Sequence, residues 1–248
     1  MATFNSQGVN ISYQVEGQGT PIMLIHGFAS SAEGNWRDSG WIDYLLTQGK
    51  QVISLDCRGH GKSDKPHDSS AYDGEIMSED VIRLMDHLDL KVVELMGYSM
   101  GARISIDLLK NNTHRFSRAI LGGMGETIFN DRSARNDDIS NAMTNKDESA
   151  VENPVAKGFR DFAKSTGADL KALAAVMAAK KAKLSPADLT HLKLPVLIVV
   201  GDKDDLVGDP QPLADSIPGS EVVILKDRDH LTAVTDQRYK ESVLAFLG

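Results

Sequence analysis

The chain has 248 residues, of which 41% are hydrophobic and 25% charged, the balance of an ordinary globular protein with one large core. The formal net charge of −8 argues against a nucleic-acid or anionic-membrane partner, and the single cysteine, Cys57, excludes an internal disulfide. No apolar run approaches the roughly 18 residues of a membrane span, and no signal peptide is visible before the first predicted strand. We therefore expect a cytoplasmic protein.

Short apolar segments along the chain predict β-strands, and segments with helical spacing lie between them. Strands are expected as a half-polar hairpin over residues 2–16, and then over 21–25, 51–55, 91–96, 118–123, 195–200 and 221–225. Helices are expected over 41–47, 78–88, 104–109 and 236–247. Ser78 is the expected N-cap of the second of these helices.

The strand pattern stops between residues 126 and 191. Residues 130–153 are polar and charged, and residues 170–183 are rich in alanine and helical in character. A structureless loop of this length is improbable inside a compact domain. We therefore expect a helical lid over 126–191, inserted after the sixth strand into a core domain formed by 1–125 and 192–248.

The alternation of continuous apolar strands with helices predicts an α/β fold. Strands of this kind form a mostly parallel sheet that is covered by helices on both faces. Ligands of open α/β sheets bind at the carboxyl ends of the strands. A lid over those ends would therefore cover a binding site.

The stretch Gly97-Tyr98-Ser99-Met100-Gly101 has the pattern G-x-S-x-G, with an apolar strand before it and a helix after it. A strand that turns into a helix within so few residues forces its central residue into strained backbone angles. Side chains on either flank would collide, and glycine at positions 97 and 101 removes that clash. The pattern predicts a serine exposed at the end of a strand.

A serine hydroxyl becomes a nucleophile when a histidine, itself held by a carboxylate, removes its proton. His230 follows the last predicted strand and precedes the last helix, so it is the candidate base. Candidates for the carboxylate follow two strands. They are Asp202, Asp204 and Asp205 after residues 195–200, and Glu126 after residues 118–123.

The chain resembles the α/β-hydrolase family, with matching pieces in order at 26–28, 56–63, 97–101, 201–204 and 230. The resemblance implies an eight-stranded, mostly parallel sheet and assigns three catalytic residues: Ser99 as nucleophile, His230 as base and Asp204 as acid. It places the oxyanion hole at the backbone amides of Phe28 and Met100. The family needs no cofactor for this chemistry, and no metal-ligand spacing is found in the chain.

Two further pieces of the resemblance are expected to be structural. His26 should brace the loop after its strand, and the motif Asp56-x-Arg58-Gly59-x-Gly61-x-Ser63 should fix the shape of a neighbouring loop. Cys57 lies inside this motif and is expected to be inert.

The implied activity is hydrolysis of an ester, thioester or lactone through an acyl-enzyme on Ser99, as in carboxylesterases. Aromatic residues are only 6% of the chain, and no basic cluster exceeds residues 180–183, so we expect a small to medium, mostly uncharged acyl substrate as the partner. Two alternatives remain open: a carbon–carbon bond hydrolase of diketone-type substrates, and a small-molecule receptor on the same fold. Candidate pocket residues are Phe28, Met100, Met124, Phe159, Phe162, Leu170, Leu173, Val176 and Met177. For most of those in the lid, the alternative that they pack the lid on the core domain is favoured.

Overall fold

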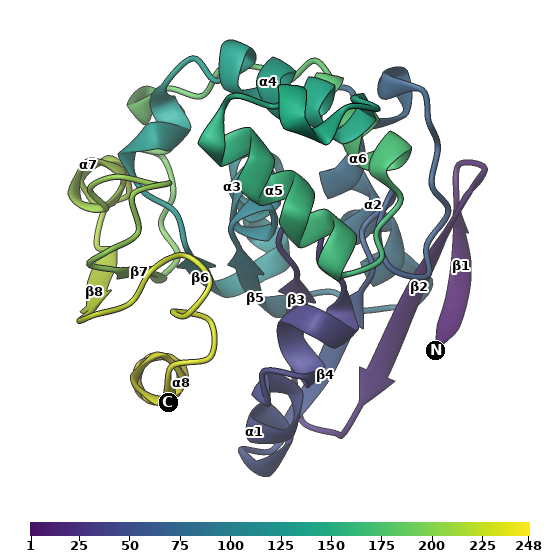
Figure 1. Cartoon of the computed structure of the whole chain (residues 1–248). Coiled ribbons are helices and arrows are strands. Elements are labelled where there is room, and N and C mark those ends of the chain that lie inside the picture. The colour runs from purple at the N-terminus through teal and green to yellow at the C-terminus, as the bar shows by residue number, and fades with distance from the viewer.

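The computed structural model describes the backbone of residues 1–248 and every side chain except that of Glu148. At its centre is one eight-stranded sheet with the strand order β1-β2-β4-β3-β5-β6-β7-β8 (Figure 1). The strands are Ala2–Ser6 (β1), Val9–Glu16 (β2), Thr20–Ile25 (β3), Lys50–Leu55 (β4), Val93–Tyr98 (β5), Phe116–Gly122 (β6), Val196–Gly201 (β7) and Glu221–Leu225 (β8). β2 runs antiparallel to both β1 and β4, and all other neighbours are parallel. The predicted fold class is confirmed.

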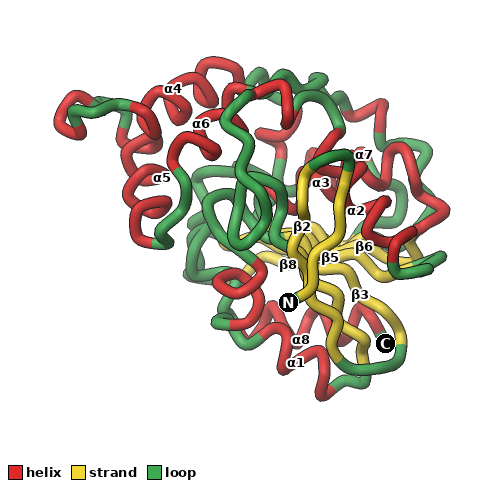
Figure 2. The backbone as a smooth tube through the Cα atoms, turned by 90° about the vertical axis from the view of Figure 1, so that its right-hand side faces the viewer, coloured by secondary structure: helices red, strands yellow, loops and turns green.

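Helices cover both faces of this sheet, because side chains along each strand alternate between two apolar clusters. Met23 and Ile25 of β3 belong to the cluster that also contains residues of Ile76–His87 (α2) and Met100–Asn112 (α3), whereas Ile22 and Leu24 belong to the cluster with Trp41–Thr47 (α1) and Gln237–Leu247 (α8). Figure 2 shows the sheet between the two layers. The helices around the sheet are Trp41–Thr47 (α1), Ile76–His87 (α2), Met100–Asn112 (α3), Gln211–Ser216 (α7) and Gln237–Leu247 (α8).

The segment of residues 126–191, called here the helical insert, has no strand in its described backbone. It contains the helices Ser133–Thr144 (α4), Pro154–Ser165 (α5) and Leu170–Ala178 (α6), with 3-10 turns at Glu126–Phe129 (η4), Glu148–Ala150 (η5) and Pro186–Asp188 (η6). α4 packs against both α5 and α6. Figures 1 and 2 show the three helices gathered on one side of the molecule, beyond the edge of the sheet where β5 ends.

The predicted bounds of three helices are wrong, and one of these is α3, which is expected over 104–109 and spans Met100–Asn112. α2 begins at Ile76, so Ser78 lies inside the helix, and its hydroxyl donates to the carbonyl of Glu75 at 2.7 Å instead of capping. α6 ends at Ala178, well before residue 183. The amide of Lys180 donates to Asp73 Oδ1 at 2.7 Å, and its carbonyl accepts from the amide of Gly74 at 2.7 Å. These tertiary hydrogen bonds hold residue 180 outside the helix.

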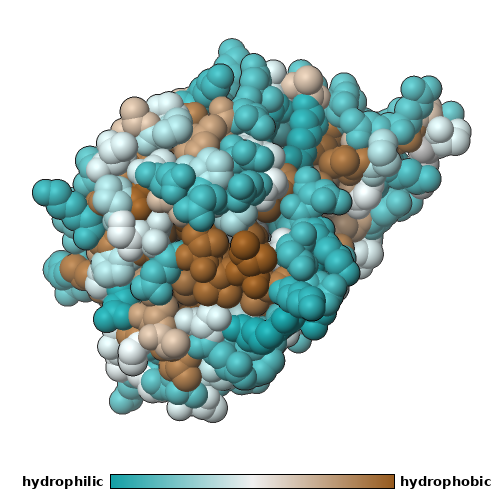
Figure 3. Space-filling view, turned by 90° about the vertical axis from the view of Figure 1, so that its left-hand side faces the viewer, coloured by the Kyte–Doolittle hydropathy of each residue, from teal (hydrophilic) through white to brown (hydrophobic). Residues whose placement is uncertain are grey.

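Apolar side chains gather near the middle of the face on which α7 and β8 lie (Figure 3). β8 is an edge strand that pairs only with β7. Ile224 in β8 is 59% exposed, and Leu231 after it is 62% exposed. No helix in the described chain is both long enough and apolar enough to cross a membrane.

Candidate active site

Ser99 lies in the tight connection between β5 and α3, with backbone angles φ 54° and ψ −110°. A Cβ at Gly97 would lie 2.3 Å from the carbonyl oxygen of Gly101, and a Cβ at Gly101 would lie 1.9 Å from the carbonyl oxygen of Ile25. Real Cβ atoms do not approach other atoms this closely, so both positions require glycine. The strain at the serine and the role of the two glycines agree with the prediction from the pattern.

The side chains of Ser99, His230 and Asp204 form one hydrogen-bonded row. His230 Nε2 lies 2.8 Å from Ser99 Oγ, and His230 Nδ1 lies 2.7 Å from Asp204 Oδ2. The side chain of Asp204 is 0% exposed and that of His230 12% exposed. With a proton on Nδ1 donated to the carboxylate, Nε2 is free to accept the proton of the serine hydroxyl.

The other three candidate carboxylates do not contact His230. Asp202 Oδ1 accepts from the amide of Arg228 at 3.3 Å, and Asp205 is exposed. Glu126 Oε1 accepts from the amide of Asp209 at 3.4 Å. Among the described side chains, Asp204 is therefore the carboxylate that orients the imidazole.

Phe28 and Met100, whose amides are the expected oxyanion donors, both line the cavity over Ser99. The loop after β3 passes beside the serine, since a Cβ at Gly27 would lie 3.6 Å from Ser99 Cβ. Met100 is the first residue of α3, where the helix dipole favours negative charge. In the described part of the chain, neither amide has a hydrogen-bond acceptor. Both N–H groups are therefore available to an oxyanion.

His26 connects two loops under the site and is itself buried. One ring nitrogen, Nδ1, lies 2.7 Å from the carbonyl oxygen of Gly27, and Nε2 accepts from the amide of Cys57 at 3.0 Å. Burial lowers the pKa of His26, so the ring stays neutral and bridges the two loops. Burial also raises the pKa of the Cys57 thiol, which keeps this cysteine protonated and unreactive.

The loop after β4 is held by two buried acidic residues. Asp56 accepts from the amides of Ala32 and Lys62 at 2.8 and 2.7 Å. Arg58 forms two hydrogen bonds of 2.6 Å to Asp80 in α2. This motif positions loops and contributes no group to the cavity.

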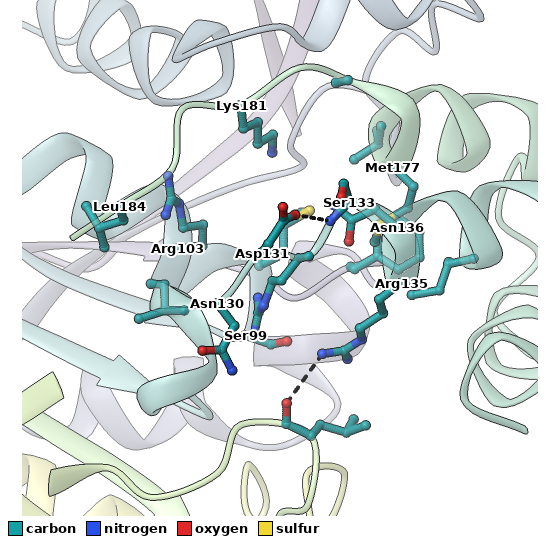
Figure 4. A pocket seen from close by; sticks show the side chains of 18 of the residues that line it. Ser99, Arg103, Asn130, Asp131, Ser133, Arg135, Asn136, Met177, Lys181 and Leu184 are labelled. Atoms are coloured by element: carbon teal, nitrogen blue, oxygen red, sulfur yellow. Dashed lines mark hydrogen bonds between the residues drawn. The ribbon is translucent and has the colours of Figure 1, made fainter. Parts of the chain in front are cut away.

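The cavity over Ser99 has a volume of about 540 Å³, within the range of small-molecule sites (Figure 4). Six of the apolar residues named from the sequence line it: Phe28, Met100, Met124, Phe159, Val176 and Met177. Leu173 is fully buried in the core, and Phe162 and Leu170 pack against the same core. These three residues stabilise the helical insert and do not line the cavity.

Basic side chains also line the cavity, a feature that the sequence did not predict. Six contribute to the lining, namely Arg103, Arg132, Arg135, Lys180, Lys181 and Lys183, against the carboxylates Asp131 and Asp137. Figure 4 shows Arg103, Arg135 and Lys181 arranged around Ser99. The expectation of an uncharged substrate depended on the absence of a basic cluster along the chain. That premise holds for the linear sequence but does not describe the cavity, because folding brings together side chains from α3, from the start of α4 and from the segment after α6.

The described residues contain no group of three or more histidine, cysteine, aspartate or glutamate side chains arranged to hold a metal ion. The chemical groups that the described residues bring to this site are the hydroxyl of Ser99, backbone amides without an acceptor, and positively charged side chains.

Comparison with known proteins agrees with this geometry. The family model for the alpha/beta hydrolase fold matches residues 20–187. The chain is 28% identical to the dihydrolipoyllysine-residue acetyltransferase component of the acetoin cleaving system of Pseudomonas putida, over 92% of the chain and 64% of that protein. It is 26% identical to the non-heme chloroperoxidase CPO-A1 of Kitasatospora aureofaciens, over 97% of both chains.

Other curated relatives match over about half of the chain, and the chain spans only 41% and 42% of two of them. Among solved structures, an esterase from Exiguobacterium antarcticum superposes with a TM-score of 0.80 at 22% identity, over 97% of this chain and 96% of that one. At this identity the likeness concerns the fold. With the family model matching well over half of its length, this chain belongs to the alpha/beta hydrolase family.

Proposed function

We propose that this chain is a serine hydrolase that cleaves the acyl bond of an ester, thioester or lactone through an acyl-enzyme on Ser99. The observation that carries the proposal is the hydrogen-bonded row from Ser99 through His230 to Asp204, with distances of 2.8 and 2.7 Å. The row opens onto a cavity of about 540 Å³, so a substrate can reach the serine. Membership of the hydrolase family supports the same chemistry.

The reaction begins when Ser99 Oγ attacks the acyl carbon and His230 Nε2 takes the hydroxyl proton. The carbonyl oxygen becomes an oxyanion and accepts hydrogen bonds from the amides of Phe28 and Met100. The tetrahedral intermediate collapses, the leaving group receives the proton from His230, and the acyl group stays on the serine. A water that is deprotonated by the same imidazole then releases the acid. Asp204 stays ionised and stabilises the imidazolium.

The helical insert acts in this proposal as a lid domain over the core domain of residues 1–125 and 192–248. Its support is that α4, α5 and the segment around the end of α6 supply one wall of the cavity, whereas the ends of the strands supply the other. A substrate bound at Ser99 would lie between the two. The insert therefore determines which acyl groups fit.

The proposal is tested with p-nitrophenyl butyrate and a serine-directed phosphonate. Wild-type protein should release nitrophenol with a burst and should gain one phosphonyl group by mass spectrometry. The Ser99→Ala variant should lose labelling, and its kcat should fall by about a million-fold. The variant Ser242→Ala, at a partly buried position in α8 that does not line the cavity, is the matched control and should behave as wild type. Wild-type protein that never labels, or labelling that survives in Ser99→Ala, would overturn the proposal.

A further inference from the structure

The cavity over Ser99 carries an excess of positive charge in a chain whose net charge is −8. Six basic and two acidic side chains line it. Most arginines elsewhere in the fold are paired with carboxylates, as Arg58 is with Asp80 and Arg228 with Asp236. Arg132 and Arg135 differ, because no carboxylate of the described side chains lies within 4 Å of either. Neither arginine therefore forms an ion pair at the cavity wall, and the carboxylate whose charge acts on Arg135 is the more distant Asp204.

Neutral acceptors hold both guanidinium groups in place. Arg132 donates from Nε to the carbonyl of Thr127 at 3.0 Å and from Nη2 to its hydroxyl at 2.6 Å. Arg135 donates from Nη1 to the carbonyl of Leu206 at 3.4 Å, as Figure 4 shows, and its guanidinium lies 5.7 Å from the ring centroid of Phe159. An arginine has five N–H donors, so most remain unused on each. The two groups are therefore held in position by neutral acceptors, and each keeps its charge and most of its donors.

The local electrostatics favour an anion at this wall. Burial and the charges of Arg135 and Arg103 lower the pKa of Arg132 to about 10, and burial lowers the pKa of Arg135. Both groups stay protonated at neutral pH, so their mutual repulsion is present in the folded protein. Arg132 also stands at the N-cap of α4, a helix with no acidic residue in its first turn. Asp131 Oδ1 accepts from the amide of Ser133 at 2.9 Å and so satisfies one donor of that helix end, which leaves the two guanidinium groups as the main positive charges at this wall.

We propose that the substrate carries a carboxylate remote from the scissile acyl bond, and that Arg132 and Arg135 bind this carboxylate while Ser99 attacks. The inference rests on the proposed function and names its substrate class. Planar guanidinium groups bind carboxylates through paired hydrogen bonds, which positions a substrate as well as attracting it. Because Phe28, Met100 and Met124 line the same cavity, the chain between the acyl carbon and the carboxylate is apolar. Half-esters of short dicarboxylic acids have this form.

Two esters of equal chain length test the proposal: the mono-p-nitrophenyl ester of glutaric acid and p-nitrophenyl pentanoate. Wild-type protein should show a kcat/KM about ten- to a hundred-fold higher for the glutaric ester, the range of charge-assisted hydrogen bonds. Arg132→Gln and Arg135→Gln should each lower this ratio about ten-fold or more, mainly through KM. Arg132→Lys should restore part of the preference, since it keeps the charge.

Arg118→Gln is the matched control. Arg118 also donates to a backbone carbonyl, that of Phe246, and its guanidinium lies 5.9 Å from that phenylalanine's ring centroid, but it does not line the cavity. Its replacement should leave the preference for the glutaric ester as in wild type. A fall in the ratio equal to that of Arg135→Gln would show a general effect of losing an arginine, and would overturn the proposal.

Binding without turnover separates this inference from the proposed function. Calorimetry on Ser99→Ala should detect glutarate but not its neutral diamide, and adding Arg135→Gln should abolish glutarate binding. If pentanoate turnover depends on Ser99 but glutarate neither binds nor is preferred as an ester, the carboxylate site is wrong and the hydrolase proposal stands. If glutarate binds through the arginines but neither ester is hydrolysed, the carboxylate site stands and the hydrolase proposal fails.

Discussion

The carbonyl oxygen of Ile25 lies 1.9 Å from the position that a Cβ on Gly101 would occupy. This contact brings the first turn of α3 against the end of β3. Because α3 and β3 lie so close, Met100 at the start of α3 and Phe28 after β3 both line the cavity over Ser99. The distance between the two amides therefore depends on the absence of a side chain at position 101.

Replacing Gly101 with alanine should push α3 away from β3, because the atom it meets is backbone and cannot move aside. Overpacking of this kind costs about 1–3 kcal/mol of unfolding free energy, and displacement of an oxyanion donor should lower kcat about a hundred-fold. Urea unfolding and p-nitrophenyl butyrate turnover measure the two effects.

Gly158→Ala in α5 is the control, since a Cβ there meets nothing within 4 Å. It should stabilise the protein by about 1 kcal/mol. If Gly101→Ala has the unfolding free energy of wild type, then α3 and β3 can separate at this contact without cost, and the prediction is wrong.

Asp204→Asn should slow the enzyme far more than the same change at either neighbouring aspartate. The amide cannot hold the imidazole in the required tautomer, and the loss in kcat should be about ten-thousand-fold. Asp202→Asn and Asp205→Asn should stay close to wild type, because neither side chain contacts His230 in the structure. Steady-state kinetics on the three variants, with thermal unfolding as a check on folding, measures this. A large loss of kcat in Asp205→Asn, with little loss in Asp204→Asn, would show that Asp204 is not the catalytic acid.

The parts of the site that follow one another along the chain could be predicted from the sequence. The elbow at 97–101 is local: a strand, a strained serine and a helix, each with its own pattern. Its glycines are required for a steric reason that lies within the turn itself. His230 follows the last strand in the same way. The choice of Asp204 among the three aspartates after β7 follows from the family resemblance, and the 2.7 Å contact between Asp204 and His230 agrees with it.

The charge of the cavity could not be predicted, because it depends on contacts between segments that are distant in sequence. Arg132 and Arg135 lie in the polar and charged segment of residues 130–153, where nothing in the sequence distinguishes them from the other charged residues. Arg103 belongs to α3. Their shared location depends on how the helical insert packs over the strand ends. The end of α6 cannot be predicted from the sequence for a similar reason. Hydrogen bonds from residue 180 to the loop at Asp73 and Gly74 override the helix propensity of the alanine-rich segment.

The buried pair of Arg58 and Asp80 should be needed for folding rather than for chemistry. Their side chains are 5% and 2% exposed, and without Arg58 the buried carboxylate of Asp80 keeps only the hydroxyl of Ser6 at 2.6 Å and the guanidinium of Arg83 at 3.8 Å. Arg58→Met should lower the unfolding free energy by about 3–5 kcal/mol, whereas Arg58→Met combined with Asp80→Leu should recover part of that loss. Lys91→Met, which breaks an exposed pair with Asp89, should cost no more than about 1 kcal/mol. Urea unfolding at pH 7 compares the variants. Equal losses for Arg58→Met and Lys91→Met would contradict this prediction.

His60 should make the protein less stable as the pH falls below about 6.5. Its ring is buried, Nδ1 lies 3.0 Å from the carbonyl oxygen of Arg58, and Nε2 has no hydrogen-bond partner among the described residues. Burial and the neighbouring His26 lower the pKa of His60 to about 3. The unfolded chain takes up a proton near pH 6.5, whereas the folded chain does so only near pH 3, so acid favours unfolding between these values.

At pH 5 this difference should cost wild-type protein about 2 kcal/mol of unfolding free energy relative to pH 7. His60→Gln removes the titrating group, so its stability should fall by about 2 kcal/mol less than that of wild type between the two pH values, whatever its stability at pH 7. His191→Gln, at an exposed position, should retain the wild-type fall. Urea unfolding of the three proteins at pH 7 and pH 5 measures the differences. If His60→Gln loses as much stability as wild type, then His60 is already protonated in the folded protein, and a charged imidazole must be accommodated beside His26.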